Sequence, residues 1–198
     1  MYFTQRSGFL PSGTLRNNMA QMNGEDGFSR ERYERAAAKY RPRKTGVLFV
    51  AEAPPSSLDR YFYFEDVKRQ DALWVELMKA VFGMENWTTT RQERRRKREW
   101  LLKFQEKGYQ LIDAVKEPMD CGDSARVEKI KENSRELISE IKQINPAMIV
   151  LIKATVHKAL FQQLETAGLP VAGCKLPFPG NGQQKKFHRE FPRAVLNL

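Results

Sequence analysis

The chain has 198 residues, a length typical of one domain, and 41% of them are hydrophobic, which is enough for a single core. A mean hydropathy of −0.61 and the lack of an apolar run of roughly 20 residues argue against a membrane protein. The net charge of +10 favours a polyanionic partner such as nucleic acid.

Two cysteines, Cys121 and Cys174, and two histidines, His157 and His188, restrict metal chemistry. Two thiols cannot form a four-cysteine zinc or iron–sulfur site, and the histidines lie in neither an HExxH nor an HxH pattern. We therefore expect no metal and no cofactor, and two thiols that are buried or free. The first residues lack the basic start and apolar stretch of a secretory signal, so we expect a cytoplasmic protein.

Residues 1–30 are polar and rich in Gly, Asn and Ser, and we expect a loose N-terminal arm there. A helix is predicted from about residue 30 to residue 40, with Ser29 as its cap. Residues 47–50 are a short continuous apolar run that a proline pair follows, which predicts a buried parallel strand and then a loop.

Predicted helices and strands also alternate in the middle of the chain. Apolar residues at helical spacing predict a helix over 73–82 that Gly83 closes, and a strongly charged helix over 88–107 follows. Residues 109–114 read as a second buried strand. The clearest apolar stripe predicts one helix over 125–144, which the Asn-Pro pair after it stops.

Residues 147–153 predict a third strand, and a helix follows with Thr155 as N-cap and Gly168 at its end. Residues 169–176 predict a weaker fourth strand, and a short helix or turn is expected at 185–191. This alternation predicts an α/β fold, a three-layer α/β/α domain with a short four-stranded parallel sheet.

We expect a single domain over residues 1–198 with its ligand crevice at the carboxyl ends of the strands. Four segments meet there: residues 53–57, Asp113 onward, 153–155 and 177–184. The first strand is not followed by GxGxxG, and the chain has no GxxxxGK[ST], which disfavours dinucleotide and P-loop sites.

Four segments together resemble the uracil-DNA glycosylase superfamily. The segment VLFVAEAPPSS is similar to its first motif, QLIDAVKEP to its second strand, and INPAMIVLIKATVHKAL to its Pro-x-x-Ile-Val-x-Leu-Gly segment. LPFPGNGQQKKFHREF looks like a degenerate form of its final His-Pro-Ser-Pro motif. The four segments follow the family's order over residues 46–191.

The resemblance implies a monomeric, uracil-DNA glycosylase-like protein of DNA repair that binds DNA through a flipped-out or single-stranded base and needs no cofactor. Its candidate reaction is hydrolysis of the N-glycosidic bond of a damaged or non-standard base. The first-motif loop would cradle the base and a flanking phosphate, and the final loop would pinch the DNA backbone. The residues implied are Ala53, Pro54, Pro55 and Ser56 in the first loop, and Pro177, Phe178, Pro179, Asn181 and Gln183 in the last.

The chain departs from the family at the positions that carry its chemistry. Ala53 stands where well-known members have a water-activating Asp, and Leu176 where they have an electrophilic His. Asp113 stands where many members read uracil with an Asn. A DNA glycosylase and a non-catalytic nucleic-acid or nucleotide-binding protein on the same fold therefore both stay open, with a structural protein of basic surface as a third class.

Glu52 and Asp113 are the candidate catalytic residues. Glu52 could position water for attack on the sugar C1′, or it could be held by the N–H groups of its loop or a nearby Arg. Asp113 could be the general base, or it could read a base. A carboxylate only accepts hydrogen bonds, so it would prefer an edge with two donors, such as guanine. The alternative for Asp113 is an N-cap or a salt bridge to Lys116 or Lys153.

Aromatic and basic runs allow two interpretations each. Tyr61 and Phe64, in the cluster 61–64, could stack on a base, although packing into the core is the favoured reading of such a cluster. The basic run 94–98 could follow phosphates or form a solvated helix face, since a Glu flanks it on each side. His188 is expected to be solvated or to cap a helix.

Overall fold

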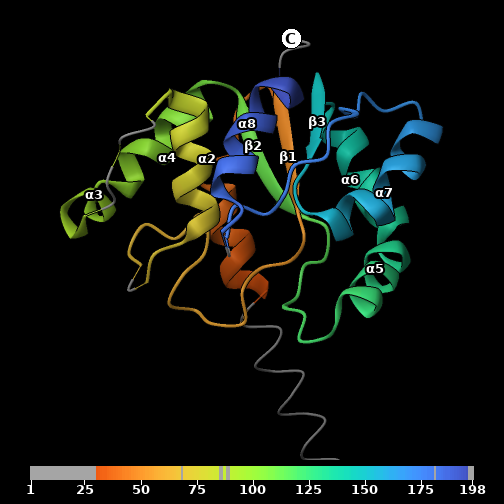
Figure 1. The fold of residues 1–198 in the computed structure, drawn as a ribbon, viewed down its shortest axis with the longest axis horizontal. Coiled ribbons are helices and arrows are strands. Elements are labelled where there is room, and N and C mark those ends of the chain that lie inside the picture. Colours follow the sequence, from red (N-terminus) through yellow and green to blue (C-terminus); the bar gives the residue numbers. More distant parts are fainter. Residues whose placement is uncertain (1–29, 68, 85–86, 88–89, 181, 196–198) are drawn as a thin grey trace, which may run out of the picture.

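A three-stranded parallel sheet in the order β2-β1-β3 forms the centre of the fold (Figure 1). The computed structural model describes residues 30–67, 69–84, 87, 90–180 and 182–195. The strands are β1 (Val47–Ala51), β2 (Tyr109–Asp113) and β3 (Met148–Leu151). β1 and β3 are apolar throughout, β2 also contains Gln110 and Asp113, and almost every residue of the three strands is buried, as strands covered on both faces require. The three stronger strand predictions are confirmed.

The predicted fourth strand is wrong. Residues 169–176 contribute only two isolated parallel bridges, from Val171 to Ile149 and from Leu176 to Ile152. Pro170 has no N–H to donate to a ladder, and Gly173 brings no side chain to pack against the sheet. The segment therefore follows the free edge of β3 without forming a continuous strand.

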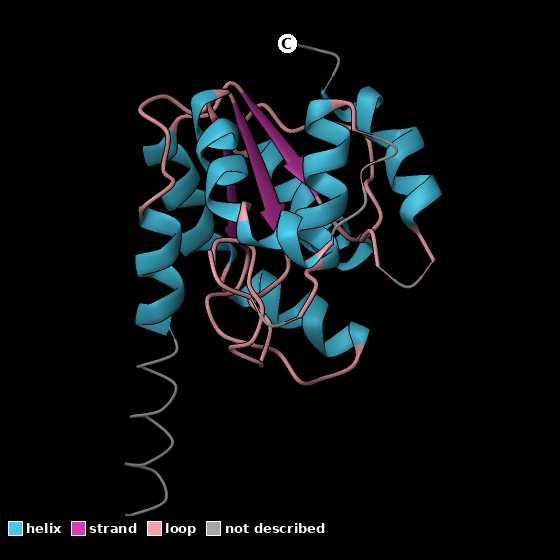
Figure 2. Cartoon of the chain, turned by 90° about the vertical axis from the view of Figure 1, so that its left-hand side faces the viewer, coloured by secondary structure: helices cyan, strands magenta, loops and turns pink. Residues whose placement is uncertain are grey.

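Helices cover both faces of the sheet and make three layers (Figure 2). Val47, Phe49 and Ala51 of β1 point to the face where α2, α4 and α8 pack, and Leu48 and Val50 point to the face of α5, α6 and α7. This alternation follows from the two-residue period of a strand. The helices are α2 (Ala72–Phe82), α3 (Arg91–Arg95), α4 (Lys97–Glu106), α5 (Asp123–Glu132), α6 (Ser134–Ile144), α7 (Ala154–Thr166) and α8 (Gln184–Val195), and residues 30–38 are also helical.

Two predicted helices are each split into two. The helix expected over 125–144 breaks at Asn133, whose side-chain amide donates to the carbonyl of Lys129. The charged helix expected over 88–107 breaks at Arg96, which ends α3 and precedes α4. Across the first break the apolar stripe continues from Ile130 to Leu137, and around the second the apolar residues all lie in α4, so the pattern alone reveals neither break.

Two cap predictions have different outcomes. Gly83 closes α2 in the left-handed conformation, at φ 65°, as predicted. Thr155 is not the N-cap of α7, because Lys153 occupies that position and the Thr155 hydroxyl donates to Glu52 instead. The final helix is longer than predicted and extends from Gln184 to Val195.

One tyrosine hydroxyl covers the outer edge of β2. Tyr63 Oη accepts from the backbone N–H of Leu111 at 2.7 Å and donates to the carbonyl of the same residue at 2.9 Å. Both outward-facing backbone groups of this edge residue are therefore satisfied inside the protein.

The predicted arm over residues 1–30 and the Ser29 cap lie almost wholly outside the described residues, which begin at residue 30. Within the described part of the chain, no helix is both long enough and apolar enough to span a bilayer.

Candidate functional site

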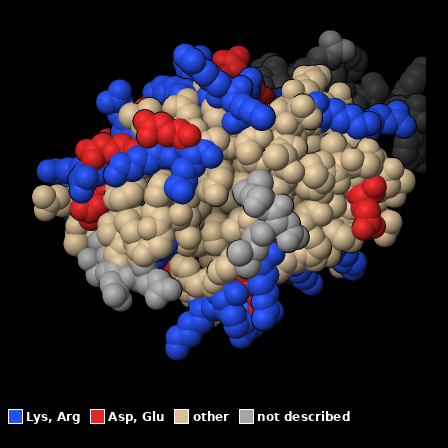
Figure 3. All heavy atoms as spheres, turned by 90° about the horizontal axis from the view of Figure 1, so that it is seen from above, with Lys and Arg blue, Asp and Glu red and all other residues tan. Residues whose placement is uncertain are grey.

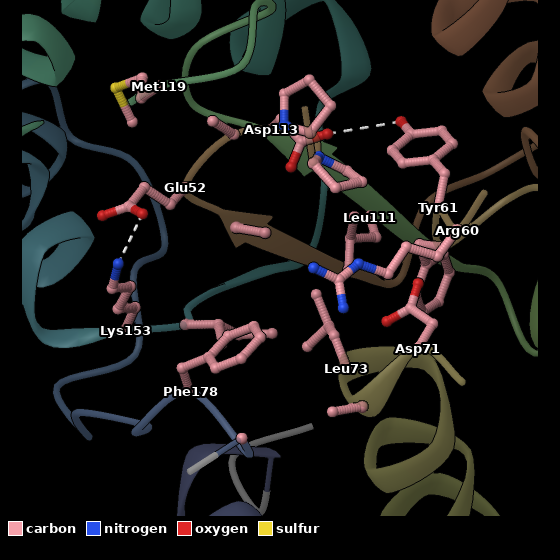
Figure 4. Close-up of a pocket in the computed structure, with 18 of the residues that line it drawn as sticks. Glu52, Arg60, Tyr61, Asp71, Leu73, Leu111, Asp113, Met119, Lys153 and Phe178 are labelled. Carbon is pink, nitrogen blue, oxygen red and sulfur yellow. Dashed lines mark hydrogen bonds and ion pairs between the residues drawn. The ribbon is translucent and has the colours of Figure 1, made fainter. Parts of the chain in front are cut away.

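A cleft of about 550 Å³ opens at the carboxyl ends of the strands, where the sequence predicted the site. The loop after β1 and the end of β2 form two sides, and the segment before α8 closes a third (Figure 4). The residues that line it are Ala51, Glu52, Ala53, Pro54, Pro55, Ser56, Arg60, Tyr61, Phe62, Gln70, Asp71, Ala72, Leu73, Leu111, Asp113, Met119, Arg126, Ile152, Lys153, Phe178, Gly180 and Gln184.

Asp113, the last residue of β2, presents a nearly buried carboxyl group, with 8% of its surface exposed. The Tyr61 hydroxyl donates to Oδ2 at 3.4 Å, and within the described residues Oδ1 accepts no hydrogen bond. Burial raises the pKa of this carboxyl to about 7, against the opposing effects of Lys116 and the Tyr61 hydroxyl. Asp113 can therefore gain or lose a proton near neutral pH, as a general acid or base must.

Glu52 lies on the other side of the cleft and is fully engaged in the fold. Its Oε2 accepts from Arg126 Nη1 and from Lys153 Nζ, both at 2.6 Å, and its Oε1 accepts from the Thr155 hydroxyl. Burial alone would raise the pKa of Glu52, but the hydrogen bonds from Lys153, Thr155 and Arg126 hold it below its ordinary value. Glu52 is a poor proton acceptor in this state, which fits the expectation that a nearby Arg holds it.

The hydrogen-bond partners of Glu52 come from α5, from the residue after β3 and from α7, and together they form the Glu52 cluster at the end of β1. Arg126 belongs to α5 and also donates to the carbonyls of Cys121 and Met119. Lys153 follows β3 and has φ 88° and ψ 144°, an unusual conformation for a residue with a side chain. Its backbone N–H donates to the carbonyl of Leu176 at 2.8 Å. The Glu52 cluster thus fixes the wall of the cleft where β1, α5 and α7 meet.

The aromatic cluster after β1 is core, as the sequence favoured, but it also contributes to the cleft. Tyr61, Phe62, Tyr63 and Phe64 are all buried, and only Tyr61 and Phe62 line the cleft. The prediction that Phe64 stacks on a ligand does not fit its position. Its ring is stacked on Tyr33 at 5.6 Å between centroids and lies away from the cleft.

The final loop contributes fewer residues than predicted. Phe178 lines the cleft and is 40% exposed, so part of this side chain is available to a ligand. Pro177, Pro179 and Gln183 do not line the cleft, whereas Gly180 and Gln184 do. A Cβ on Gly180 would lie 2.7 Å from the Phe178 ring, so glycine allows this ring position. Asn181 lies outside the described residues.

Arg60 and Asp71 are cleft residues that the sequence did not indicate. The exposed Arg60 side chain extends into the cleft (Figure 4) and makes no hydrogen bond or ion pair with the described residues. Asp71 is the N-cap of α2, and its carboxylate accepts from the Trp74 N–H. An alternation of apolar residues and loops locates neither, because both belong to the irregular segment between β1 and α2.

A second cleft of about 680 Å³ lies behind Asp113 and Tyr61, between the helical residues 30–38 and α6. Asp113 and Tyr61 line both clefts and form a wall between them. The charged groups of the second cleft are largely paired with each other, as in the 2.6 Å ion pair between Lys116 and Glu140. The predicted ion pair from Asp113 to Lys116 or Lys153 does not form.

Figure 3 shows the end opposite the cleft, where Lys and Arg side chains lie around the rim with several Asp and Glu side chains among them. Within the run 94–98, Arg96 pairs with Glu93 and Glu99, and Lys97 is completely buried. The solvated-face interpretation therefore holds for Arg96 and is wrong for Lys97. The His188 side chain is partly exposed and does not cap a helix, because its Nε2 lies 2.6 Å from Oε2 of Glu76 in the middle of α2.

The described residues contain no group of three or more His, Cys, Asp or Glu side chains that could hold a metal ion. No family model and no curated protein matches this sequence.

Proposed function

We propose that the cleft takes up one base of a DNA strand and that Asp113 contacts this base or activates water beside it. The observation that carries the proposal is a buried carboxyl group with a free oxygen and a pKa of about 7, in the wall of a cleft in a protein of net charge +10. The proposal includes the uracil-DNA glycosylase-like relationship, a monomeric state and a cytoplasmic location.

The lining of the cleft suits a flat, polar-edged ring. Phe178 offers an exposed aromatic ring, and the buried Phe62, Leu111 and Leu73 form the apolar lining behind it. Arg60 supplies a cation for the phosphate that accompanies any base in a strand. Stacking and phosphate contact would hold the strand, which leaves the base edge to Asp113.

The proton on Asp113 decides which edge it can read. A deprotonated carboxylate accepts two hydrogen bonds and suits an edge with two donors, as in guanine. A protonated carboxyl group donates one bond and accepts another, as the amide of Asn does, and suits uracil or thymine. With a pKa of about 7, base preference should change across neutral pH.

The candidate reaction is hydrolysis of the N-glycosidic bond. Asp113 in its carboxylate form accepts a proton from water, and the water oxygen bonds to the sugar C1′ as the bond from C1′ to the base nitrogen breaks. The base leaves with the electron pair of that bond and takes up a proton from solvent. The carboxylate also offsets positive charge that develops on the sugar. Glu52 does not take this role in the proposal, because three hydrogen bonds already engage it.

Binding without catalysis is the second candidate function. Ala53 lines the cleft where the resemblance would place a water-activating Asp, and the neighbouring Glu52 is held in ion pairs. A protein with this arrangement could bind a base and leave its bond to the sugar intact.

A panel of labelled DNA duplexes and single strands tests the proposal. Each oligonucleotide carries one uracil, hypoxanthine, xanthine, alkylated base or mismatch, and both affinity and base release are measured from pH 5.5 to 8.5. The variants are Asp113→Asn and Phe178→Ala, and Asp120→Asn, which alters an exposed acid, is the matched control.

Base release that Asp113→Asn abolishes and Asp120→Asn preserves would support a glycosylase. Salt-sensitive binding without release, weakened by Phe178→Ala, would support the binding protein. Neither binding nor release by the wild-type protein would refute both functions. Binding with a base preference that Asp113→Asn leaves unchanged would refute base reading by Asp113.

A further inference from the structure

Lys97 is the first residue of α4, and its side chain is completely buried. It belongs to the densest basic run of the chain, and the neighbouring Arg96 and Arg98 are exposed. A lysine side chain almost never lies fully inside a protein unless it has a partner. Its burial therefore calls for a specific contact.

That contact is the backbone of Tyr61. Lys97 Nζ donates to the Tyr61 carbonyl at 2.6 Å and lies 5.2 Å from the centroid of the Trp74 ring. Among the described residues no carboxylate comes within ion-pair distance of Nζ. An apolar side chain of similar length would fill this space without burying a charge, so packing alone does not account for a lysine here.

The two ends of Tyr61 connect Lys97 to the cleft. The Tyr61 carbonyl accepts from Lys97, and its hydroxyl donates to Asp113 Oδ2 at 3.4 Å. The ring between them is 94% buried against Tyr33 and Phe64, at centroid distances of 4.7 and 5.1 Å. A shift of the main chain at residue 61 would therefore move the hydroxyl away from the carboxyl group.

We propose that Lys97 is a positioning residue of the cleft: it fixes the main chain at Tyr61, keeps the Tyr61 hydroxyl on Asp113, and so sets the protonation of the Asp113 carboxyl group. The importance of this effect for a ligand rests on the proposed function. The effect on Asp113 itself does not, and it can be measured on the free protein.

Three charged groups act on Asp113 at the end of this chain of contacts. Asp113 is acted on by Lys116, which follows β2, by Asp71 at the start of α2, and by Glu140 of α6. Asp71 also acts on Lys97. Lys116 lowers the pKa of Asp113, while Asp71 and Glu140 raise it, and substitution of Lys97 leaves all three in place. The bond from Tyr61 lowers that pKa, so its loss should raise the pKa.

The test is the titration of the Asp113 side-chain carbon by NMR in wild-type protein, Lys97→Met, Tyr61→Phe and the double variant. Lys103→Met, which alters an exposed lysine of the same helix, is the matched control. Each single variant should shift the Asp113 midpoint upward by roughly 0.5 to 1 pH unit, the scale of one ordinary hydrogen bond. The double variant should show no further shift, because both substitutions remove the same bond.

An unchanged midpoint in folded Lys97→Met would overturn the inference, and so would shifts that add in the double variant. Lys97→Gln, whose shorter neutral amide cannot reach the same carbonyl, carries the same expectation if Lys97→Met does not fold. DNA binding with an unchanged Asp113 titration refutes this inference alone. The expected titration without DNA binding refutes the proposed function alone.

Discussion

Replacement of Asp113 by Asn should stabilise the folded protein at neutral and alkaline pH, although it alters the proposed centre of the cleft. Asn has the shape of Asp, carries no charge, and can still accept the hydrogen bond from Tyr61. The substitution therefore removes the cost of holding a carboxylate in a buried place and preserves the packing around it.

The magnitude follows from the difference in pKa between the unfolded and folded states. The carboxyl group has an ordinary pKa of 3.8 and, because burial outweighs Lys116 and the Tyr61 hydroxyl, one of about 7 in the fold. Each pH unit corresponds to about 1.4 kcal/mol, so Asp113 lowers the stability at pH 8 by about 4 kcal/mol relative to pH 3. Between pH 3.8 and about 7 the Asp113 carboxyl group holds a proton in the folded state and has lost it in the unfolded state. The free energy of unfolding therefore falls as the pH rises toward and through 7.

Urea unfolding of both proteins, followed by tryptophan fluorescence from pH 4 to 8.5, measures the difference directly. The free energy of unfolding of Asp113→Asn should match that of wild type near pH 4 and exceed it by about 4 kcal/mol at pH 8. Asp120→Asn should show no such trend, because Asp120 is exposed. A difference that is constant with pH, or that favours wild type at pH 8, would refute the reasoning.

Three further substitutions test other contacts through the same unfolding measurement. Tyr63→Phe should destabilise the fold by about 2 kcal/mol, because the N–H and C=O groups of Leu111 lose a shared partner. Glu52→Gln should cost about 3 kcal/mol by leaving two cations without their carboxylate. The Glu52 contribution is present above pH 4.5 and should disappear in acid, since its folded pKa lies below that value. Burial lowers the Lys97 pKa from 10.5 to about 8, so the free energy of unfolding of the wild type should rise by about 3 kcal/mol from pH 8 to 10.5. Lys97→Met should not show this rise.

Each of these three predictions has an outcome that would contradict it. Tyr109→Phe removes a hydroxyl that bonds to no described residue and should be nearly neutral, so an equal loss in both tyrosine variants would contradict the edge contact. An acid transition of Glu52→Gln that coincides with that of wild type would contradict the role of the Glu52 cluster. A wild-type stability that is level above pH 8 would contradict a buried, charged Lys97.

The sheet was predictable because its strands are short, mostly apolar segments between clear breaks. The mostly apolar composition of residues 47–50, 109–114 and 147–153 predicts that these segments are buried. The helices between them predict that the strands run parallel. The break at Asn133 was not predictable from periodicity, since Ile130 and Leu137 keep one stripe across it. A local amide-to-carbonyl bond decided it.

The sequence predicted where the cleft lies, but only some of the residues that line it. Glu52 and Asp113 directly follow or end strands, so a parallel sheet brings them to one edge. The contacts of Glu52 to Arg126 and Lys153 join residues 74 and 101 positions apart, which no local pattern encodes. The burial of Lys97 was not predictable either. Its charged sequence neighbours predict an exposed side chain, whereas the carbonyl to which it donates lies 36 positions away.

Because the backbone of Lys153 has a positive φ, a substitution at this position that leaves the stability unchanged would be misleading. A positive φ of 88° in a residue with a side chain costs on the order of 1–3 kcal/mol, which glycine avoids. The same side chain holds the Glu52 carboxylate. Lys153→Gly would release the backbone strain and remove the ion pair at once, with opposite effects on stability. Two large contributions can cancel at this position, so only comparison with Lys153→Met, which keeps the strain and loses the charge, separates them.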